Sequence, residues 1–219
     1  MPIGFRAFLD FERPDPALVD AYREIPSSNI GDCVKRMNCM FGGIRSYNSL
    51  KLVGTAFTVK VPAGDNLVAQ MALDYAKPGD IIVIDVGGAP IAVWGELASN
   101  SAMNNGVKGV VIEGAIRDID DIIDLGFPAF ARNAVPCAGE AKGYGGIGME
   151  IIIGGQRVRT GDWIVGDESG LIVVPKEEAV EVANRALDVH EHETRTRAEI
   201  RKGSTLSKVN ELAKWEPVK

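Results

Sequence analysis

An arginine and an aspartate stand side by side in the stretch GVVIEGAIRDIDDI, which covers residues 109–122. The apolar run before them is typical of a buried strand, and the segment after them, DIDDIIDLG, is typical of a helix. Arg117 offers a planar fork that binds a carboxylate or a developing enolate. Asp118 offers hard oxygen atoms, which suit a divalent ion such as Mg²⁺. Together they would polarise a 2-keto group and stabilise the enolate that forms when a carbon–carbon bond breaks.

Two other segments are expected beside this pair. IIVIDV (81–86) is typical of a strand covered on both faces, and it leads into the loop DVGGAP. WGELASNSAMNN (94–105) is typical of a helix whose first amides, near Gly95, Glu96 and Leu97, suit a carboxylate. Glu96 would orient or deprotonate a metal-bound water. Because ligands of open α/β sheets bind outside the carboxyl ends of strands, we expect these segments to share one site.

Each of these residues also has a purely structural explanation. Asp118 would cap the helix that follows it, which stabilises a helix by about 1 kcal/mol. Arg117 would pair with Asp120 or Asp121 on the protein surface. Glu96 is favourable in a first helical turn without any function. Spacing alone favours these structural explanations for Arg117 and Asp118.

Four more residues carry groups that could do chemistry. Lys60 would form a Schiff base with a keto acid, or it would be an outward-facing position of the strand LVGTAFTVKV. Asp85, at a strand end, is equally open to both kinds of explanation. His190 and His192 lie in the charged stretch HEHETRTR, which argues against a histidine-rich zinc site.

Composition restricts the class of protein. The chain has 219 residues, of which 46% are hydrophobic and 25% charged, as in ordinary globular proteins. No apolar run approaches the roughly 18 residues of a membrane helix, and the N-terminal stretch has no apolar signal region. The net charge of −6 argues against binding to a nucleic-acid backbone. The three cysteines form no CxxC pair and are expected to be free thiols of a cytoplasmic protein.

Strand and helix patterns alternate from about residue 50 to 132, which predicts an α/β layered fold. Helices are also expected at 15–24 and at 27–37, the latter with a cap near Ser28 and Asn29. The Gly-rich segment 138–175 is expected to form β-hairpins that close the same domain. The segment 176–203 is expected to be an amphipathic helix. We predict one domain over 1–219, with a core at about 25–200 and a tail at 201–219.

A glycine motif in this chain resembles a dinucleotide fingerprint. Gly143, Gly145 and Gly148 spell GxGxxG. Such a fingerprint needs a strand before the glycines and a helix after them, whereas here a strand-like segment, MEIIIGG, follows. The motif is therefore interpreted as a loop that needs a permissive backbone.

Taken in order, several segments closely resemble the RraA-like family, whose enzymatic branch is 4-hydroxy-4-methyl-2-oxoglutarate/4-carboxy-4-hydroxy-2-oxoadipate aldolase. They are VGTAFTVKVPAGDN, KPGDIIVIDVGG, WGELAS, GVKGVVIEGAIRDIDDIIDLGFPAFAR and GDWIVGDESGLIVVP. The resemblance covers about residues 25–200. It implies a single-domain α/β sandwich of the swivelling β/β/α type with a C-terminal helix, assembled as a homotrimer or homohexamer with active sites between subunits. The implied reaction is a class II retro-aldol cleavage that needs Mg²⁺ or Mn²⁺ and releases pyruvate, with oxaloacetate decarboxylation as a side activity.

The resemblance also implies roles for particular residues. The family's aldolase pattern has an acidic residue, twenty intervening residues and then Arg-Asp, which matches Glu96, residues 97–116, Arg117 and Asp118. The pattern usually has Asp at the first position and Gly four residues before it, where this chain has Glu96 and Ala92. Arg117 would bind substrate and stabilise the enolate, Asp118 would hold the metal, and the amides from Gly95 to Leu97 would bind the pyruvate carboxylate. A neighbouring subunit's glutamate would complete the metal site, for which Glu193 is the first choice and Glu191 the second.

Two alternatives to the aldolase remain open. The same family contains regulators that bind an endoribonuclease, and these lack the aspartate after the arginine. A metal-dependent lyase or hydrolase acting on another 2-keto acid would use the same residues. The expected partners are a small 2-keto acid and further copies of the chain, with no nucleic acid and no membrane.

Overall fold

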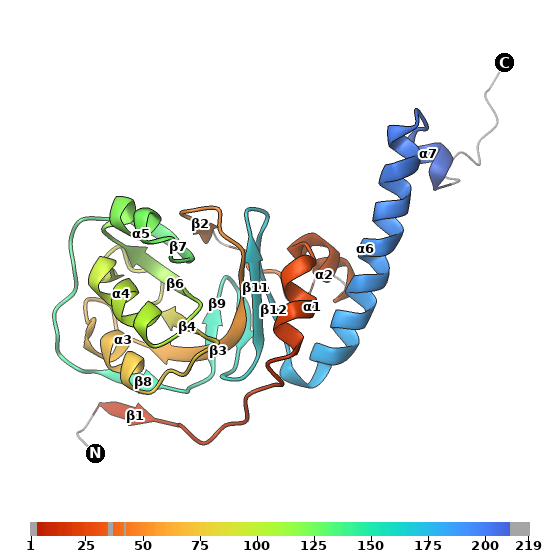
Figure 1. Cartoon of the computed structure of the whole chain (residues 1–219). Coiled ribbons are helices and arrows are strands. Elements are labelled where there is room, and N and C mark those ends of the chain that lie inside the picture. Colours follow the sequence, from red (N-terminus) through yellow and green to blue (C-terminus); the bar gives the residue numbers. More distant parts are fainter. Residues whose placement is uncertain (1–3, 35–36, 42, 211–219) are drawn as a thin grey trace.

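The centre of the fold is a mixed β-sheet with the strand order β1-β8-β3-β4-β6-β7-β2 (Figure 1). The computed structural model describes residues 4–34, 37–41 and 43–210. Strands β3, β4, β6 and β7 run parallel, and β4 and β6 are buried over their whole length. The strands of this path are β1 (Phe5–Ala7), β2 (Arg45–Ser46), β3 (Leu52–Lys60), β4 (Asp80–Asp85), β6 (Gly109–Ile116), β7 (Ala129–Ala134) and β8 (Gly145–Ile147).

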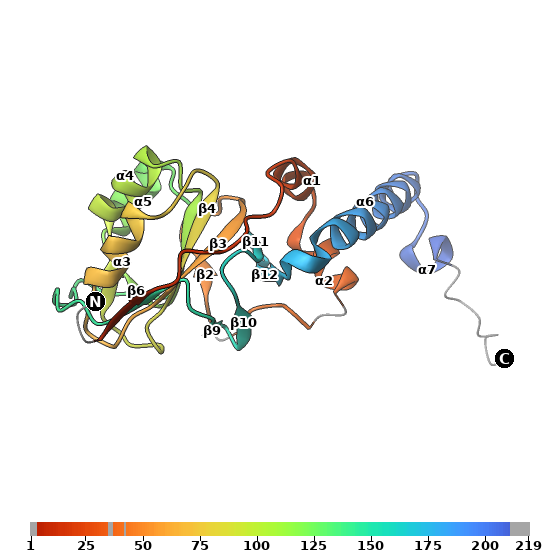
Figure 2. The ribbon, with the colours of Figure 1, turned by 90° about the horizontal axis from the view of Figure 1, so that it is seen from below.

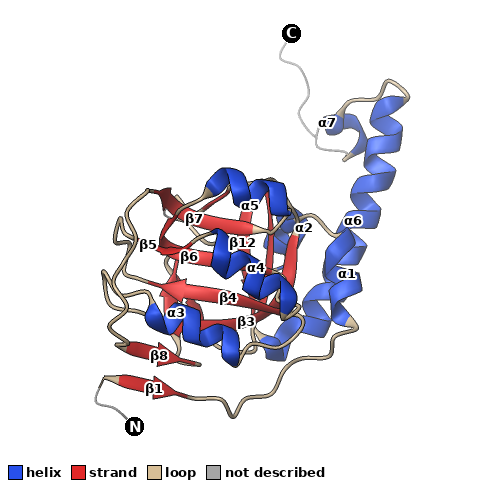
Figure 3. Cartoon of the chain, turned by 60° about the vertical axis from the view of Figure 1, so that its left-hand side comes forward, coloured by secondary structure: helices blue, strands red, loops and turns tan. Residues whose placement is uncertain are grey.

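Helices cover one face of the parallel strands (Figure 3). They are α3 (Leu67–Met71), continued by a 3₁₀ turn (Ala72–Asp74), α4 (Glu96–Asn104) and α5 (Ile119–Leu125). Alternate strand residues such as Ile82, Ile84 and Ile112 point into this layer and are fully buried. This is the α/β alternation that the sequence predicts for residues 50–132.

Two hairpins cover the opposite face of the sheet. β9 (Ile151–Ile153) pairs with β10 (Gln156–Val158), and β11 (Trp163–Asp167) pairs with β12 (Gly170–Val174). β11 also pairs with the first half of β3, so the second hairpin joins the main sheet. Ile81, Val83 and Val111 pack against Ile164 and Val173 from this side. The β-hairpins expected in residues 138–175 are therefore confirmed.

A second helical layer packs on the outer face of the β11–β12 hairpin (Figure 2). It consists of α1 (Leu18–Glu24), α2 (Ser27–Cys33) and the proximal part of α6 (Ala179–Arg201). Tyr22 and Trp163 lie with their ring centroids 5.7 Å apart. The hairpin is thus apolar on both faces, which explains the unbroken apolar runs WIV and LIVV. The distal part of α6 projects away from the sheet and carries the short α7 (Leu206–Val209).

The layered α/β fold with a C-terminal helix is confirmed, but two local expectations were wrong and one strand was not predicted. α2 begins at Ser27 after Pro26 and has no side-chain cap, whereas a cap near Ser28 and Asn29 was expected. Trp94 ends a short strand, β5 (Ala92–Trp94), and does not begin a helix. β1 pairs in parallel with β8 and went unpredicted. A strand of three residues is too short to show a period-two alternation in the sequence. Whether such a segment forms a strand therefore depends on the strand with which it pairs. Residues 35–36, at the end of the second expected helix, and 211–219 lie outside the described residues.

Among the described residues, no helix combines the length and the apolar character that crossing a bilayer requires.

A buried ion pair holds the N-terminal segment to the start of β4. Arg13 donates two hydrogen bonds to Asp80, from Nε to Oδ1 at 2.9 Å and from Nη2 to Oδ2 at 2.7 Å. The Asp80 side chain is only 1% exposed, and its Oδ2 also accepts the Lys77 N–H at 2.8 Å. A carboxylate buried this deeply depends on its partners, because it has no access to water.

Replacing Arg13 with alanine should therefore destabilise the fold. We expect a loss of roughly 3 kcal/mol in the free energy of unfolding, because a buried carboxylate loses its partner. Urea denaturation followed by circular dichroism measures this. Arg23→Ala is the matched control, since Arg23 pairs with exposed Asp20 and should cost about 0.5 kcal/mol or less. Equal losses in the two variants would show that the buried Arg13–Asp80 pair contributes no more to the free energy of unfolding than an exposed pair does.

Candidate functional site

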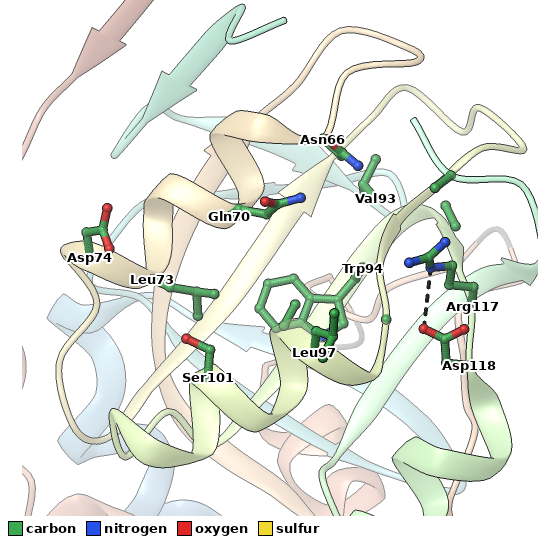
Figure 4. A pocket seen from close by; sticks show the side chains of 14 residues that line it. Asn66, Gln70, Leu73, Asp74, Val93, Trp94, Leu97, Ser101, Arg117 and Asp118 are labelled. Atoms are coloured by element: carbon green, nitrogen blue, oxygen red, sulfur yellow. Dashed lines mark ion pairs between the residues drawn. The ribbon is translucent and has the colours of Figure 1, made fainter. Parts of the chain in front are cut away.

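A cavity of about 330 Å³ opens between α3 and α4, beyond the carboxyl ends of β5 and β6. Figure 4 shows Arg117 and Asp118 at one end, Asp74 at the other, and Trp94 and Gln70 between them. Its volume lies at the lower end of the range for small-molecule sites. The cavity is thus of a size for a small acid, and its charged groups are at its two ends.

The short strand β5 and the long strand β6 together bring Arg117 to this cavity. β5 pairs in parallel with the end of β6, and the Arg117 N–H donates to the Trp94 carbonyl oxygen at 3.0 Å. The Trp94 indole is 3% exposed, stacks on Phe127, and donates from Nε1 to Ser99 Oγ at 2.9 Å. The floor of the cavity is therefore rigid, and it fixes the backbone from which the guanidinium extends.

Arg117 and Asp118 face each other at the mouth of the cavity. Arg117 Nε lies 3.3 Å from Asp118 Oδ2, and the two side chains are 41% and 35% exposed. This corrects the structural alternative in which Arg117 pairs with Asp120 or Asp121. Both groups stay accessible to a ligand from solvent.

The backbone of Asp118 is strained. Its φ of 57° and ψ of 46° put it in the left-handed region, where among the described residues Ser49 is the other non-glycine with positive φ. This conformation costs about 1 kcal/mol for a residue with a side chain, although Asp and Asn tolerate it best. Asp118 occupies the N-cap position of α5, but its carboxylate forms no capping hydrogen bond there. The helix-cap explanation is therefore wrong, and the left-handed backbone of Asp118 requires another explanation.

The Asp118 carboxylate instead reaches the start of α4. Its Oδ2 accepts the Glu96 N–H at 3.2 Å. Gly95 makes this approach possible. A Cβ at this position would lie closer to Asp118 Oδ2 than van der Waals contact allows, and 3.1 Å from Arg117 Cγ. The φ of Gly95 is −158°, so the need for glycine comes from space and not from backbone strain. Of the first-turn amides of α4, Glu96 is engaged, while those of Leu97 and Ala98 have no acceptor inside the helix.

None of the three predicted glutamates, Glu96, Glu193 and Glu191, lines the cavity in the single chain. Glu96 Oε1 accepts a hydrogen bond from Asn100 Nδ2 on the next turn of α4. Glu193 belongs to α6, and its Oε2 lies 3.6 Å from Arg197 Nη2. Figures 1 and 2 show the distal part of α6 far from α5, the helix that Asp118 precedes. Glu191 belongs to the same part of α6. Within the described residues of one chain, no group of three or more His, Cys, Asp or Glu side chains is placed to hold a metal ion.

The loop DVGGAP, which we expected to share the site, does not contribute to the cavity wall. Asp85 forms an ion pair with Lys60 and accepts the Gly87 N–H at 2.8 Å. Lys60 stands at the end of β3, with its side chain 46% exposed. The charges of Asp85 and Lys60 are thus paired with each other. The GxGxxG motif lies partly on β8 and is followed by the strand β9, with no helix after it. It therefore lacks the context of a dinucleotide fingerprint, as expected, although its middle part is a strand and not a loop.

Several residues of the wall were not predicted from sequence. They are Asn66, Gln70, Asp74 and Ser101, which line the cavity from α3, its 3₁₀ turn and α4. No motif marks them, because α3 and α4 come together only through the sheet beneath them. One signal is present in the sequence, because Asp and Asn, the residue types at 65 and 66, are favoured at the start of a helix.

Asp65 fixes the position of α3 and of the loop opposite. Its side chain accepts the backbone N–H groups of Leu67 at 2.9 Å, Lys142 at 3.2 Å and Tyr144 at 2.8 Å. Burial raises the pKa of Asp65, yet these backbone hydrogen bonds outweigh it and hold the pKa below its ordinary value. The residue therefore positions the part of the wall that contains Asn66.

The comparisons with known proteins agree with this architecture. The family described as RraA-like, Aldolase/RraA, matches residues 16–173. The chain belongs to the RraA-like family. A relative from Halalkalibacterium halodurans is 38% identical over 77% of this chain and 81% of its own length, and it bears the name "Putative 4-hydroxy-4-methyl-2-oxoglutarate aldolase". The resemblance drawn from the sequence is thereby confirmed.

Solved structures of other proteins share the fold. A protein from Pseudomonas syringae pv. tomato is similar with a TM-score of 0.80 and 30% identity, over 91% of this chain and 100% of the other. Streptomyces coelicolor RraAS2, described as an unusual member of the RNase ES inhibitor RraA protein family, has a TM-score of 0.76 and 25% identity, over 85% of this chain and 98% of the other. The RraA-like family thus includes relatives named for catalysis and relatives named for inhibition.

Replacing Asp65 with asparagine should destabilise the protein in a way that depends on pH. A group with a lowered pKa stabilises the fold fully above its unfolded pKa of about 3.9, and this stabilisation is lost as the pH falls through the folded value. We expect wild type to exceed Asp65→Asn by roughly 2 kcal/mol at pH 7, because charged acceptors bond the amides more strongly. The difference should shrink below about pH 4. Urea denaturation at pH 7 and at pH 3 measures it, and a constant difference at both values would contradict the assignment.

Proposed function

We propose that this RraA-like protein is a carbon–carbon lyase that depends on a divalent metal and releases pyruvate from a 4-hydroxy-2-keto acid. The acids implied by its family are 4-hydroxy-4-methyl-2-oxoglutarate and 4-carboxy-4-hydroxy-2-oxoadipate, and oxaloacetate would be decarboxylated at the same site. One observation carries the proposal. The Arg117–Asp118 pair is held at the mouth of a cavity, against the start of α4, by a strained backbone that serves no helix cap.

Arg117 and α4 would bind the pyruvate half of the substrate. The free amides of Leu97 and Ala98 carry partial positive charge at the helix N-terminus and suit the carboxylate. The guanidinium of Arg117 lines the cavity next to them and would interact with the 2-keto oxygen. Negative charge develops on that oxygen when the C3–C4 bond breaks, so a fixed cation stabilises the transition state more than the ground state.

The proton balance of the cleavage is simple. The 4-hydroxyl group loses its proton and its oxygen forms the C4=O bond of the second product, while the C3–C4 bond electrons move into the pyruvate enolate. C3 then takes up a proton to give pyruvate. Glu96 is the proposed base, acting through a water molecule. This role requires Glu96 to leave Asn100, its hydrogen-bond partner in the structure. In oxaloacetate the same bond breaks with loss of carbon dioxide, and no base is needed.

The residues at the mouth of the cavity fit a hard divalent cation such as Mg²⁺ or Mn²⁺. Asp118 Oδ2 is engaged by the Glu96 N–H and by Arg117, whereas Oδ1 has no hydrogen-bond partner among the described residues. Mg²⁺ is often held by one or two carboxylates, with waters and substrate oxygens filling its other positions. Asp118 would hold the ion, which when bound would polarise the 2-keto group as a Lewis acid.

We propose that a second carboxylate comes from another copy of the chain. The distal part of α6, which carries Glu193 and Glu191, projects away from the sheet, so either glutamate would reach a neighbour's site only in an assembly. We therefore propose that the working form is a homotrimer or homohexamer. A cytoplasmic location and the absence of nucleic-acid and membrane partners also remain predictions.

Replacing Asp118 with asparagine should abolish pyruvate release. Asparagine tolerates the left-handed backbone as well as aspartate does, so the variant should fold, yet it is a poor ligand for Mg²⁺. We expect wild type to release pyruvate from oxaloacetate and from 4-hydroxy-4-methyl-2-oxoglutarate with Mg²⁺ and to stop with EDTA, and the variant to lose at least 100-fold in rate. A coupled lactate dehydrogenase assay, corrected for metal alone, measures this.

Asp121→Asn, an exposed residue in the first turn of α5, is the matched control and should retain the wild-type rate. No pyruvate above the metal-only background from either acid would refute the lyase. The next experiment would then be a pull-down with an endoribonuclease, because RraAS2 is described as belonging to a family of ribonuclease inhibitors.

Replacing Gly95 with alanine should impair catalysis while leaving the fold nearly intact. The added Cβ would collide with Asp118 Oδ2 and press on Arg117, both of which are half-exposed and free to shift. We expect a loss of about 100-fold in kcat/KM, because displacements near 1 Å have effects of this size. The midpoint of urea denaturation should change little. Wild-type kinetics in Gly95→Ala would show that the close approach of Asp118 to α4 is not needed for the reaction.

A further inference from the structure

We propose that Ser99 is a positioning residue of the candidate site, because its hydroxyl group fixes the start of α4, where the amides of Leu97 and Ala98 stand free. The inference rests on the proposed function and concerns how the carboxylate of the keto acid is held. Ser99 does not touch the substrate in this proposal, and it acts through Trp94 and Gly95.

The start of α4 lacks the side-chain cap that many helices have. A cap residue normally accepts the N–H of the second or third helical residue through its side chain. The cap position of α4 is Gly95, which has no side chain, and a larger residue would collide with Asp118. The amides of Leu97 and Ala98, which a cap would bind, have no hydrogen-bond acceptor among the described residues. Another interaction must therefore hold the first turn if these amides are to stay open for a ligand.

Ser99 supplies that interaction. Its Oγ accepts a hydrogen bond from Trp94 Nε1 at 2.9 Å and donates one to the Gly95 carbonyl oxygen at 3.0 Å. Trp94 stands immediately before the cap position, and Ser99 is the fourth residue of the helix. A contact between these two positions fixes the angle at which the chain enters a helix, as apolar pairs do in the hydrophobic staple. The Trp94–Ser99 hydrogen bond is thus a polar form of that staple.

Burial makes this hydrogen bond a firm constraint. Ser99 is fully buried and Trp94 is 3% exposed, so water does not compete for either group. The Trp94 ring stacks on Phe127, and the Trp94 carbonyl oxygen accepts the Arg117 N–H. The staple therefore ties the free amides of α4 to the same residue that positions Arg117. Because Ser99 has no exposed surface in the single chain, assembly with other copies would leave its surroundings unchanged.

Loss of the staple should weaken substrate binding more than it slows the chemical step. The amides of Leu97 and Ala98 would bind the carboxylate of the keto acid, whose charge is the same in the ground state and in the transition state. An interaction of this uniform kind lowers KM and leaves kcat nearly unchanged. A merely structural hydroxyl group would contribute to stability and have no effect on KM.

Replacing Ser99 with alanine removes the hydroxyl group from both of its partners. We expect the KM for oxaloacetate to rise roughly 10-fold or more, with kcat within about 3-fold of wild type, in initial rates of pyruvate release with Mg²⁺. Thr58→Val is the matched control, because Thr58 is fully buried on the hairpin face of the sheet and donates to the Met149 carbonyl oxygen at 2.6 Å. Both variants should lower the midpoint of urea denaturation, but Thr58→Val should keep the wild-type KM.

A double-mutant cycle with Trp94→Phe isolates the hydrogen bond itself. Phenylalanine keeps an aromatic ring at this position and leaves Ser99 bonded to Gly95, so the variant buries no unpaired donor and should fold. Each single variant should raise KM, and the double variant should raise it by less than the product of the two effects, since both break one interaction. If circular dichroism shows that Ser99→Ala is unfolded, the KM of Trp94→Phe decides the test.

The outcomes separate this inference from the proposed function. If wild type releases pyruvate and a folded single variant keeps the wild-type KM, or if the two effects multiply in the double variant, the staple has no role in substrate binding and the lyase stands. If wild type releases no pyruvate above the metal-only background from oxaloacetate or from 4-hydroxy-4-methyl-2-oxoglutarate, the proposed function fails, and this inference fails with it.

Discussion

The hydrogen bond from the Arg117 N–H to the Trp94 carbonyl oxygen joins the ends of β5 and β6, and the geometry of the candidate site depends on it. It sets Gly95 beside Arg117 and Asp118, so that α4 begins where the cation and the carboxylate stand. β6 is buried along its whole length between the two layers, which gives this junction a rigid base. A three-residue strand thereby controls the relative position of three groups that we assign to catalysis.

The mouth of the cavity combines strain with incomplete pairing. Asp118 keeps a left-handed backbone. Its Oδ2 contacts both Arg117 and the Glu96 N–H of α4, whereas its Oδ1 has no hydrogen-bond partner among the described residues. A surface ion pair of this exposure contributes little to stability, so stability does not explain the arrangement. Strain of this kind tends to persist at functional positions, where the surrounding structure holds the residue in place. The same reasoning separates Asp118 from Asp80, whose carboxylate is buried, fully paired and structural.

Much of this fold could be predicted from the sequence, because its main elements carry strong local signals. The buried run IIVIDV (81–86) falls on β4 (Asp80–Asp85) with bounds that differ by one residue, and the turn residues Gly154-Gly155 join β9 to β10. The pair Arg117–Asp118 was found because it follows such a run. What could not be predicted depends on contacts between distant segments. β1 and β5 exist only through their partners, and the distal wall of the cavity depends on how α3 packs beside α4. The roles of Glu193 and Glu191 depend on surfaces of other copies of the chain, which a single sequence does not specify.

The two ends of the cavity come from different parts of the chain, and this has a consequence for specificity. The groups assigned to the chemistry lie at the β6–α5 junction, while the distal wall comes from α3 and from the outer side of α4. Asp65 ties α3 to the loop at 142–144 and not to β6, so side chains of α3 are free to change without disturbing Arg117. Members of one family would then share bond cleavage and differ in the acids they accept, because function resides in sites and not in folds.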